Sequence, residues 1–246
     1  MNEKYIREEF NELYVEYPCL RLLVGRDECW NMKGLFKFSA DYPGYKKIVD
    51  EYQLNILISH EYPHVLPRIT ETAGRIPDNF HKYSDGTLCL GSSLNVRQNF
   101  MREPSILGFV KYCVIPYLYQ YSYYEKYGEM VWGERPHGGK GIAISYYEYF
   151  DIKDNNTILE FLKILDDNNY RGHWNCPCGS QKKIRDCHGE LLVNLKTLLS
   201  NQEIRNDYEN VLSDSLKGGE KLSPEKHYSK IVKKKIRQMQ RKNMIK

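Results

Sequence analysis

Three cysteines and a histidine near the C-terminal end of the chain have the residue types and the spacing of metal ligands. Cys176, Cys178, Cys187 and His188 form a C-x-C-x8-C-H pattern, and Gly179 supplies the sharp turn that such a pattern requires. Thiolate sulfur and imidazole nitrogen together favour tetrahedral zinc. The sequence therefore predicts one Zn²⁺ per chain. It predicts a structural ion, because four protein ligands leave no position open for a substrate.

Cys89 has the surroundings of a reactive thiol. It lies in residues 74–99, a stretch with little hydrophobic periodicity and much Gly, Asn, Asp and Ser, which predicts a long surface loop. Long loops in compact domains usually carry function, and Gly86 and Gly91 would let another chain approach the cysteine closely. The alternative is a small buried side chain in a Leu-Cys-Leu run, because free cysteine is among the most buried residue types.

The composition indicates a folded protein of the cytoplasm. The 246 residues are 41% hydrophobic, enough for one large domain or for a medium and a small one. We see neither an apolar run of about 18 residues nor a signal peptide, and therefore expect a cytoplasmic protein without a membrane partner. Disulfides are rare in that compartment, so Cys19, Cys29 and Cys113 are predicted to pack as ordinary core residues.

The positive charge is concentrated at the C-terminus. Residues 226–246 hold nine Lys or Arg and no acid, so the net charge of +4 leaves −5 for the remainder of the chain. Such a run is usually solvated, although it could hold nucleic acid or an acidic partner electrostatically. Nucleic acid is therefore kept as a candidate partner of the tail.

Hydrophobic periodicity predicts a helix, then an antiparallel sheet, then further helices. Residues 3–16 have the apolar spacing of an amphipathic helix. Alternating or β-rich runs separated by turn residues predict four strands, at 20–24, 34–39, 52–59 and 68–72. Helical spacing returns at 105–127, with a kink or break at Pro116, and again at 159–165 and 191–199. The predicted fold class is α+β.

The region around Cys89 resembles the ubiquitin-conjugating enzyme family. The segment Tyr62–Ile69, with Pro63 and Pro67, is similar to the Tyr-Pro turn that follows the third strand of that family. The segment Asp85–Leu90 is similar to the one that carries its nucleophilic cysteine, and the order of elements agrees. The resemblance covers about residues 1–150 and implies a UBC-like fold. Within that family, the chain is similar to the stand-alone conjugating-enzyme-like proteins of bacterial anti-phage signalling operons.

The resemblance implies roles for three residues. Cys89 would accept a protein C-terminus as a thioester and pass it to a lysine or another nucleophile of a target protein. His81 would orient the loop or assist proton transfer, and Asp85 would position or deprotonate the amine. By analogy, the target is a neighbouring cyclic-nucleotide-making nucleotidyltransferase. The chain shows no adenylate-forming segment, so a separate activating enzyme or an already primed target is also implied.

The metal-ligand pattern in turn resembles the SEC-C motif, a zinc knuckle that serves protein or ribosome contact in its relatives. The expected organisation is a UBC-like catalytic domain at 1–150, a helical segment at 151–216 with the knuckle at 173–190, and a basic tail at 217–246.

Two rival functions stay open. The first is a UBC-like module that holds a protein tail without catalysis. The sequence His81-Lys82-Tyr83 favours this module, because the family has His-Pro-Asn at these positions and uses the asparagine to support the oxyanion. The presence of Cys89 argues against it. The second is a zinc-stapled adaptor for nucleic acid or ribosomes, whose binding would weaken steeply with salt.

Overall fold

The computed structural model of this chain describes residues 3–25, 29–133 and 136–218. These residues divide into two compact units. The first comprises residues up to Gly91 together with 98–133, and the second comprises Ser92–Arg97 and the described residues from 136 onward. The expected domain boundary at residue 150 falls at the end of a helix that belongs to the second unit. The basic tail beyond Gly218 lies outside the described residues.

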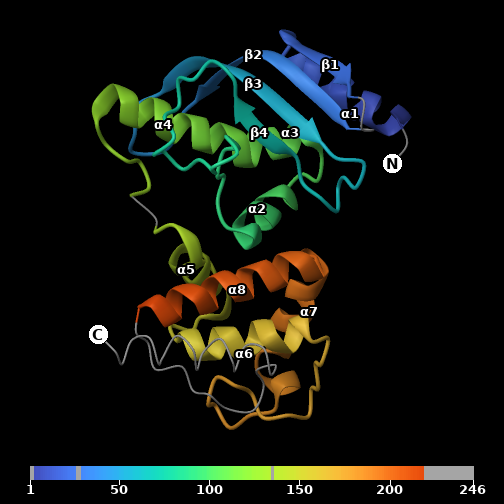
Figure 1. The fold of residues 1–246 in the computed structure, drawn as a ribbon, viewed down its shortest axis with the longest axis vertical. Coiled ribbons are helices and arrows are strands. Elements are labelled where there is room, and N and C mark those ends of the chain that lie inside the picture. The colour runs from blue at the N-terminus through green and yellow to red at the C-terminus, as the bar shows by residue number, and fades with distance from the viewer. Residues whose placement is uncertain (1–2, 26–28, 134–135, 219–246) are drawn as a thin grey trace. The chain divides into compact units, whose positions relative to one another are not determined.

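The first unit begins with a helix and a four-stranded antiparallel sheet, as the sequence predicted (Figure 1). Helix α1 (Glu3–Glu16) precedes strands β1 (Leu20–Val24), β2 (Trp30–Ala40), β3 (Ile48–Ile58) and β4 (Arg68–Glu71). The strands lie in sequence order, so the sheet is a meander. Strands β2 and β3 are longer than predicted, because they pair without interruption from Trp30↔Ile58 to Ala40↔Ile48.

One face of this sheet is buried under the helix α4 (Ile115–Tyr127), which contacts β2 and β3 (Figure 1). Alternate side chains of the two long strands point to this face, since successive residues of a strand point to opposite sides. The buried ones are Trp30, Met32, Phe36 and Phe38 on β2, and Ile48, Tyr52, Leu54, Ile56 and Ile58 on β3. The core of the first unit therefore lies between sheet and helix.

The predicted helix at 105–127 is one helical path in three parts. α3 (Ile106–Phe109) leads into the π-helical turn η1 (Val110–Val114), which leads into α4. The predicted kink or break at Pro116 does not interrupt the path, because Pro116 lies in the first turn of α4, where its missing N–H is tolerated. Cys113 is buried in η1, as predicted.

The second unit is helical. It contains the first residues of α2 (Ser93–Phe100), then α5 (Gly138–Phe150), α6 (Asn155–Asp166), the 3₁₀ turn η2 (Ile184–Asp186), α7 (Gly189–Leu198) and α8 (Asn201–Lys217). Its own hydrophobic core gathers Phe150, Phe161, Leu162, Leu192 and Ile204, all almost fully buried. Within the described residues, no helix has the length and apolar character needed to cross a membrane.

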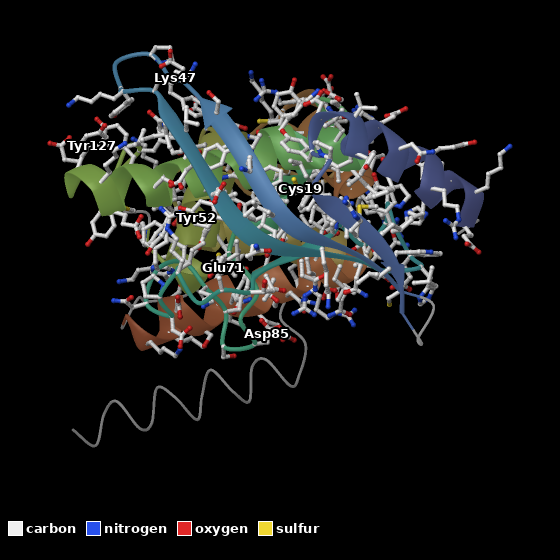
Figure 2. All side chains as sticks on the ribbon, turned by 90° about the horizontal axis from the view of Figure 1, so that it is seen from above. Cys19, Lys47, Tyr52, Glu71, Asp85 and Tyr127 are labelled. Carbon is white, nitrogen blue, oxygen red and sulfur yellow. The ribbon has the colours of Figure 1, made fainter. Side chains whose placement is uncertain are left out.

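Two sequence-based expectations need correction, and one helix has bounds that were not predicted. The irregular segment expected at 74–99 ends earlier, because residues 93–99 are helical and the hydroxyl of Ser92 accepts the N–H of Asn95 at 3.2 Å at the start of that helix. Helix α8 lies almost wholly within the helical segment expected at 151–216, but its own bounds were not predicted. Cys19, expected in the core, is exposed (Figure 2). Its neighbour Leu20 takes the inward-facing position at the start of β1.

Candidate functional site

The four predicted metal ligands lie together in the second unit. The ligand atoms of Cys176, Cys178, Cys187 and His188 are all within 4.8 Å of one another. His188 Nδ1 is 3.3 Å from the sulfur of Cys176 and 3.2 Å from that of Cys187, and the sulfurs of Cys178 and Cys187 are 3.5 Å apart. The cluster can therefore hold a metal ion.

A short two-stranded turn positions the first two cysteines. The N–H of Cys176 donates to the carbonyl of Lys182 at 2.8 Å, and the N–H of Ile184 donates to the carbonyl of Trp174 at 2.9 Å. Gly179 turns the chain between these two sides with a φ of 78°, a left-handed conformation that glycine adopts without steric cost. The turn brings both sulfurs to the same side as η2, which delivers Cys187.

His188 is oriented by the helices around it. Its Nε2 lies 3.2 Å from the carbonyl oxygen of Phe150, at the end of α5, and its ring packs 5.2 Å from the ring of Phe161. A carbonyl accepts only, so Nε2 carries the proton and Nδ1 is left to face the thiols. Metal-bound histidines commonly have such a second partner, which fixes the tautomer and the ring orientation.

The thiols of the cluster differ in environment. Burial raises the pKa of Cys176 to about 12. Burial also acts on Cys178, but there hydrogen bonds from Ser180 and the neighbouring thiols outweigh it and lower the pKa. A thiolate is thus favoured at Cys178, and the thiolate is the form that binds metal.

The segment around Cys89 lies in the first unit and runs beside β4. The N–H of Leu88 donates to the carbonyl of Ile69 on β4 at 2.8 Å, and Leu88 itself is buried. Cys89 donates its N–H to the carbonyl of His81 at 2.7 Å, so the two residues are neighbours across a small hairpin. The thiol-bearing residue is half-buried. The structure thereby brings together two of the three predicted catalytic residues through their backbones.

Asp85 lies at the exposed tip of this hairpin (Figure 2). Its Oδ1 accepts the N–H of Thr87 at 3.0 Å, and its other carboxylate oxygen pairs with Arg68, which also donates to the hydroxyl of Thr87 at 3.0 Å. The hydrogen bonds with Thr87, assisted by Arg68, hold the pKa of Asp85 below its usual value. These contacts suit a residue that shapes the turn, and a base with a lowered pKa accepts a proton less readily.

The loop between β4 and the hairpin, residues 72–80, is anchored by the buried carboxylate of Glu71 (Figure 2). Glu71 accepts N–H groups from Ala73 at 2.6 Å, Arg75 at 2.7 Å and Ile76 at 3.3 Å. The ammonium of Lys82 then donates to the carbonyl of Ile76 at 2.9 Å. Lys82, the residue after His81, is therefore tied to β4 through Ile76 and Glu71.

Sequence reasoning missed Tyr117, on α4. Its hydroxyl donates to the carbonyls of Phe80 and His81, at 3.1 and 3.2 Å. The carbonyl of His81 is the one that also accepts the N–H of Cys89. Burial raises the pKa of Tyr117, and the nearby Cys89 raises it further. No pattern in the sequence marks this residue, because it lies 36 positions after His81 in a run of several tyrosines.

Comparisons with known proteins identify no relative of this chain. No family model matches it, no curated protein matches it, and no solved structure matches it.

Proposed function

We propose that this chain is a ubiquitin-conjugating-like acyl carrier that forms a thioester at Cys89. The observation that carries the proposal is the placement of Cys89 and His81. A half-exposed thiol and the flap histidine are held side by side in a hydrogen-bonded hairpin that follows a four-stranded antiparallel meander. The UBC-like fold is supported by the order of helix, meander, irregular segment and helices.

The proposed reaction has two steps. The Cys89 thiolate attacks an activated C-terminal carbonyl of a donor protein, a C–S bond forms, and the activating group leaves with its electron pair. The amine of a target lysine then attacks the thioester carbonyl, an amide forms, and Cys89 leaves as the thiolate while the amine loses its proton to a base or to water. A nucleotidyltransferase of a bacterial anti-phage system is the target that the resemblance suggests.

The second unit is proposed to be a zinc-stapled docking module of the SEC-C type. With Zn–S distances of about 2.3 Å and Zn–N of about 2.0 Å, the edges of a tetrahedral site measure about 3.5 to 3.8 Å. Three of the six separations between ligand atoms, at 3.2 to 3.5 Å, are close to these edges, and all six are within 4.8 Å. Three thiols and an imidazole are also a donor set that suits zinc.

A trapping experiment tests the thioester. The protein is incubated with ATP and the proteins encoded beside it, and adducts are resolved on non-reducing gels. Wild type should give an adduct that a thiol reagent releases, and Cys89→Ser should give one that resists the thiol reagent, because an oxygen ester is less easily displaced by thiols. Cys19→Ala, at an exposed cysteine outside the hairpin, is the matched control and should behave as wild type.

A non-catalytic binding module is the second candidate, and one observation favours it. Tyr83, at the position of the family's asparagine, has a side chain with a relative exposure of 54%, and its N–H donates within the hairpin to the carbonyl of Thr87. If wild type forms no thiol-sensitive adduct while Cys89→Ala still binds the same partner as wild type, this candidate replaces the enzyme.

A further inference from the structure

We propose that Tyr117 is a positioning residue for Cys89, and that its hydroxyl fixes the turn from which the thiol is presented. The inference deepens the proposed function and rests on it, since it names the group that keeps the proposed nucleophile in place.

The carbonyl of His81 accepts hydrogen bonds from both Cys89 and Tyr117. The carbonyl oxygen of His81 accepts the N–H of Cys89 at 2.7 Å and also the hydroxyl of Tyr117 at 3.2 Å. The same hydroxyl lies 3.1 Å from the carbonyl of Phe80. Tyr117 thus bridges two consecutive carbonyls of the flap, and one of these holds the backbone of Cys89.

The backbone of His81 has an unusual conformation. Its φ is 36°, in the left-handed region that residues with a side chain seldom adopt. Such a conformation persists only where its surroundings enforce it, and it is common near functional sites. Here Tyr117 supplies the constraint from the helix side, and the N–H of Cys89 supplies it from the other side of the hairpin.

Tyr117 is itself held in place by its burial and by ring packing. Its side chain is buried, and its ring packs at 5.9 Å from Phe80, which in turn packs at 4.7 Å from Tyr121. The hydroxyl therefore has little freedom to leave the flap carbonyls. The Cys89 thiol is near enough to add to the effect of burial in raising the pKa of Tyr117.

Helix α4 offers two matched controls. Tyr119 donates its hydroxyl to the carbonyl of Lys46 at 2.9 Å, and Tyr121 donates to the carbonyl of Arg75 at 2.7 Å. Both bonds resemble that of Tyr117 in type, and both are made to a carbonyl outside the hairpin. Replacing each tyrosine by phenylalanine removes one hydroxyl and keeps the ring, so the three variants differ chiefly in which carbonyl is released.

The test compares Tyr117→Phe, Tyr119→Phe and Tyr121→Phe in the full chain by two measurements that need no conjugation partner. Hydrogen–deuterium exchange should show that peptides covering residues 80–90 exchange about three- to tenfold faster in Tyr117→Phe alone, as expected for one lost hydrogen bond. The rate of iodoacetamide alkylation at Cys89, read by mass spectrometry at one fixed pH, should rise in Tyr117→Phe alone, because the released turn exposes the half-buried cysteine more often.

A merely structural role of Tyr117 would lower the melting temperature without changing the alkylation rate of this one thiol. Unchanged exchange at residues 80–90, or an alkylation rate at Cys89 equal to that of wild type, overturns the inference. The proposed function fails separately, when wild type gives no thiol-sensitive adduct. Where the adduct does form, Tyr117→Phe should lower the rate of its formation at saturating donor and leave the donor concentration for half-maximal rate unchanged.

Discussion

Asp207 is the most deeply buried carboxylate among the described residues, with a relative exposure of 2%. Its two oxygens accept the hydroxyl of Tyr146 at 2.8 Å and that of Ser93 at 3.2 Å. Burial raises the pKa of Asp207 to about 6, and the neighbouring carboxylate of Glu203 adds to the effect. The folded protein therefore binds a proton at this residue more tightly than the unfolded chain does.

Asp207 is therefore expected to contribute to the stability of the folded protein by an amount that depends on pH. Because the folded pKa lies above the unfolded value near 3.8, the contribution is complete below pH 3.8 and is lost as the pH rises through about 6. Asp207→Asn cannot ionise, so the unfolding free energy of wild type relative to this variant should fall by roughly 2 kcal/mol between pH 4.5 and pH 7.5. Urea denaturation at several pH values measures it.

The comparison between variant and wild type matters, because protonation of the metal ligands also changes stability at acid pH and affects both proteins equally. Glu209→Gln, at an exposed acid on the same helix, is the control and should show no such trend. If the difference between Asp207→Asn and wild type is constant over this pH range, Asp207 titrates as it does in the unfolded chain, and the assigned pKa shift is wrong.

At the scale of the element, helix α8 depends on its first turn. The hydroxyl of Ser200 accepts the N–H of Glu203 at 3.2 Å, and the carboxylate of Glu203 accepts the N–H of Ser200 at 2.8 Å, a reciprocal capping box. Ser200→Ala should lower the unfolding free energy by about 1 kcal/mol, because an N–H at the helix start loses its acceptor. Chemical denaturation measures the change.

Ser213, within α8, provides the contrast to Ser200. Ser213→Ala should be neutral or slightly stabilising, because alanine is the better helix former and no cap is lost. Equal losses in the two variants would show that the capping box does not stabilise α8.

The elements also show which features the sequence could predict. The first helix and the four strands follow from local apolar spacing, and the metal ligands follow from residue types only a few positions apart. The start of helix α8 is marked in the sequence by Ser200 and Glu203, which have the spacing of a capping box and not an apolar period. The path through Pro116 had none, because the π-helical turn before it is held by the burial of Val110, Cys113 and Val114, which local pattern does not encode.

Tyr117 shows the same limit at the candidate site. His81 and Cys89 are eight positions apart and were found from the motif around them, whereas Tyr117 reaches them only through the packing of α4 against the flap. A contact across 36 positions cannot be read from local pattern. The residues proposed to carry chemistry were therefore found from local pattern, and the residue proposed to hold them was not.

The two units have separate hydrophobic cores. Among the described residues, the metal cluster lies in the second unit alone. The cluster fastens the chain at 176–188 to α5 and α6 through His188, whose partners are the Phe150 carbonyl and the Phe161 ring. Structural zinc contributes on the order of 10 kcal/mol to small metal-bound folds, as much as the whole stability of many domains. The two units should therefore respond differently when metal is removed.

Chelation of the metal at neutral pH should abolish hydrogen-exchange protection in peptides from α5, α6 and α7 and leave peptides from β2 and β3 protected. Cys178→Ser should reproduce this pattern without chelator and show no further change when chelator is added. Cys19→Ser, at a cysteine outside the cluster, should respond to chelator as wild type does. Protection in the helices that survives chelation would show that their hydrophobic core suffices without metal, whereas equal loss in β2 and β3 would show that the two units unfold as one.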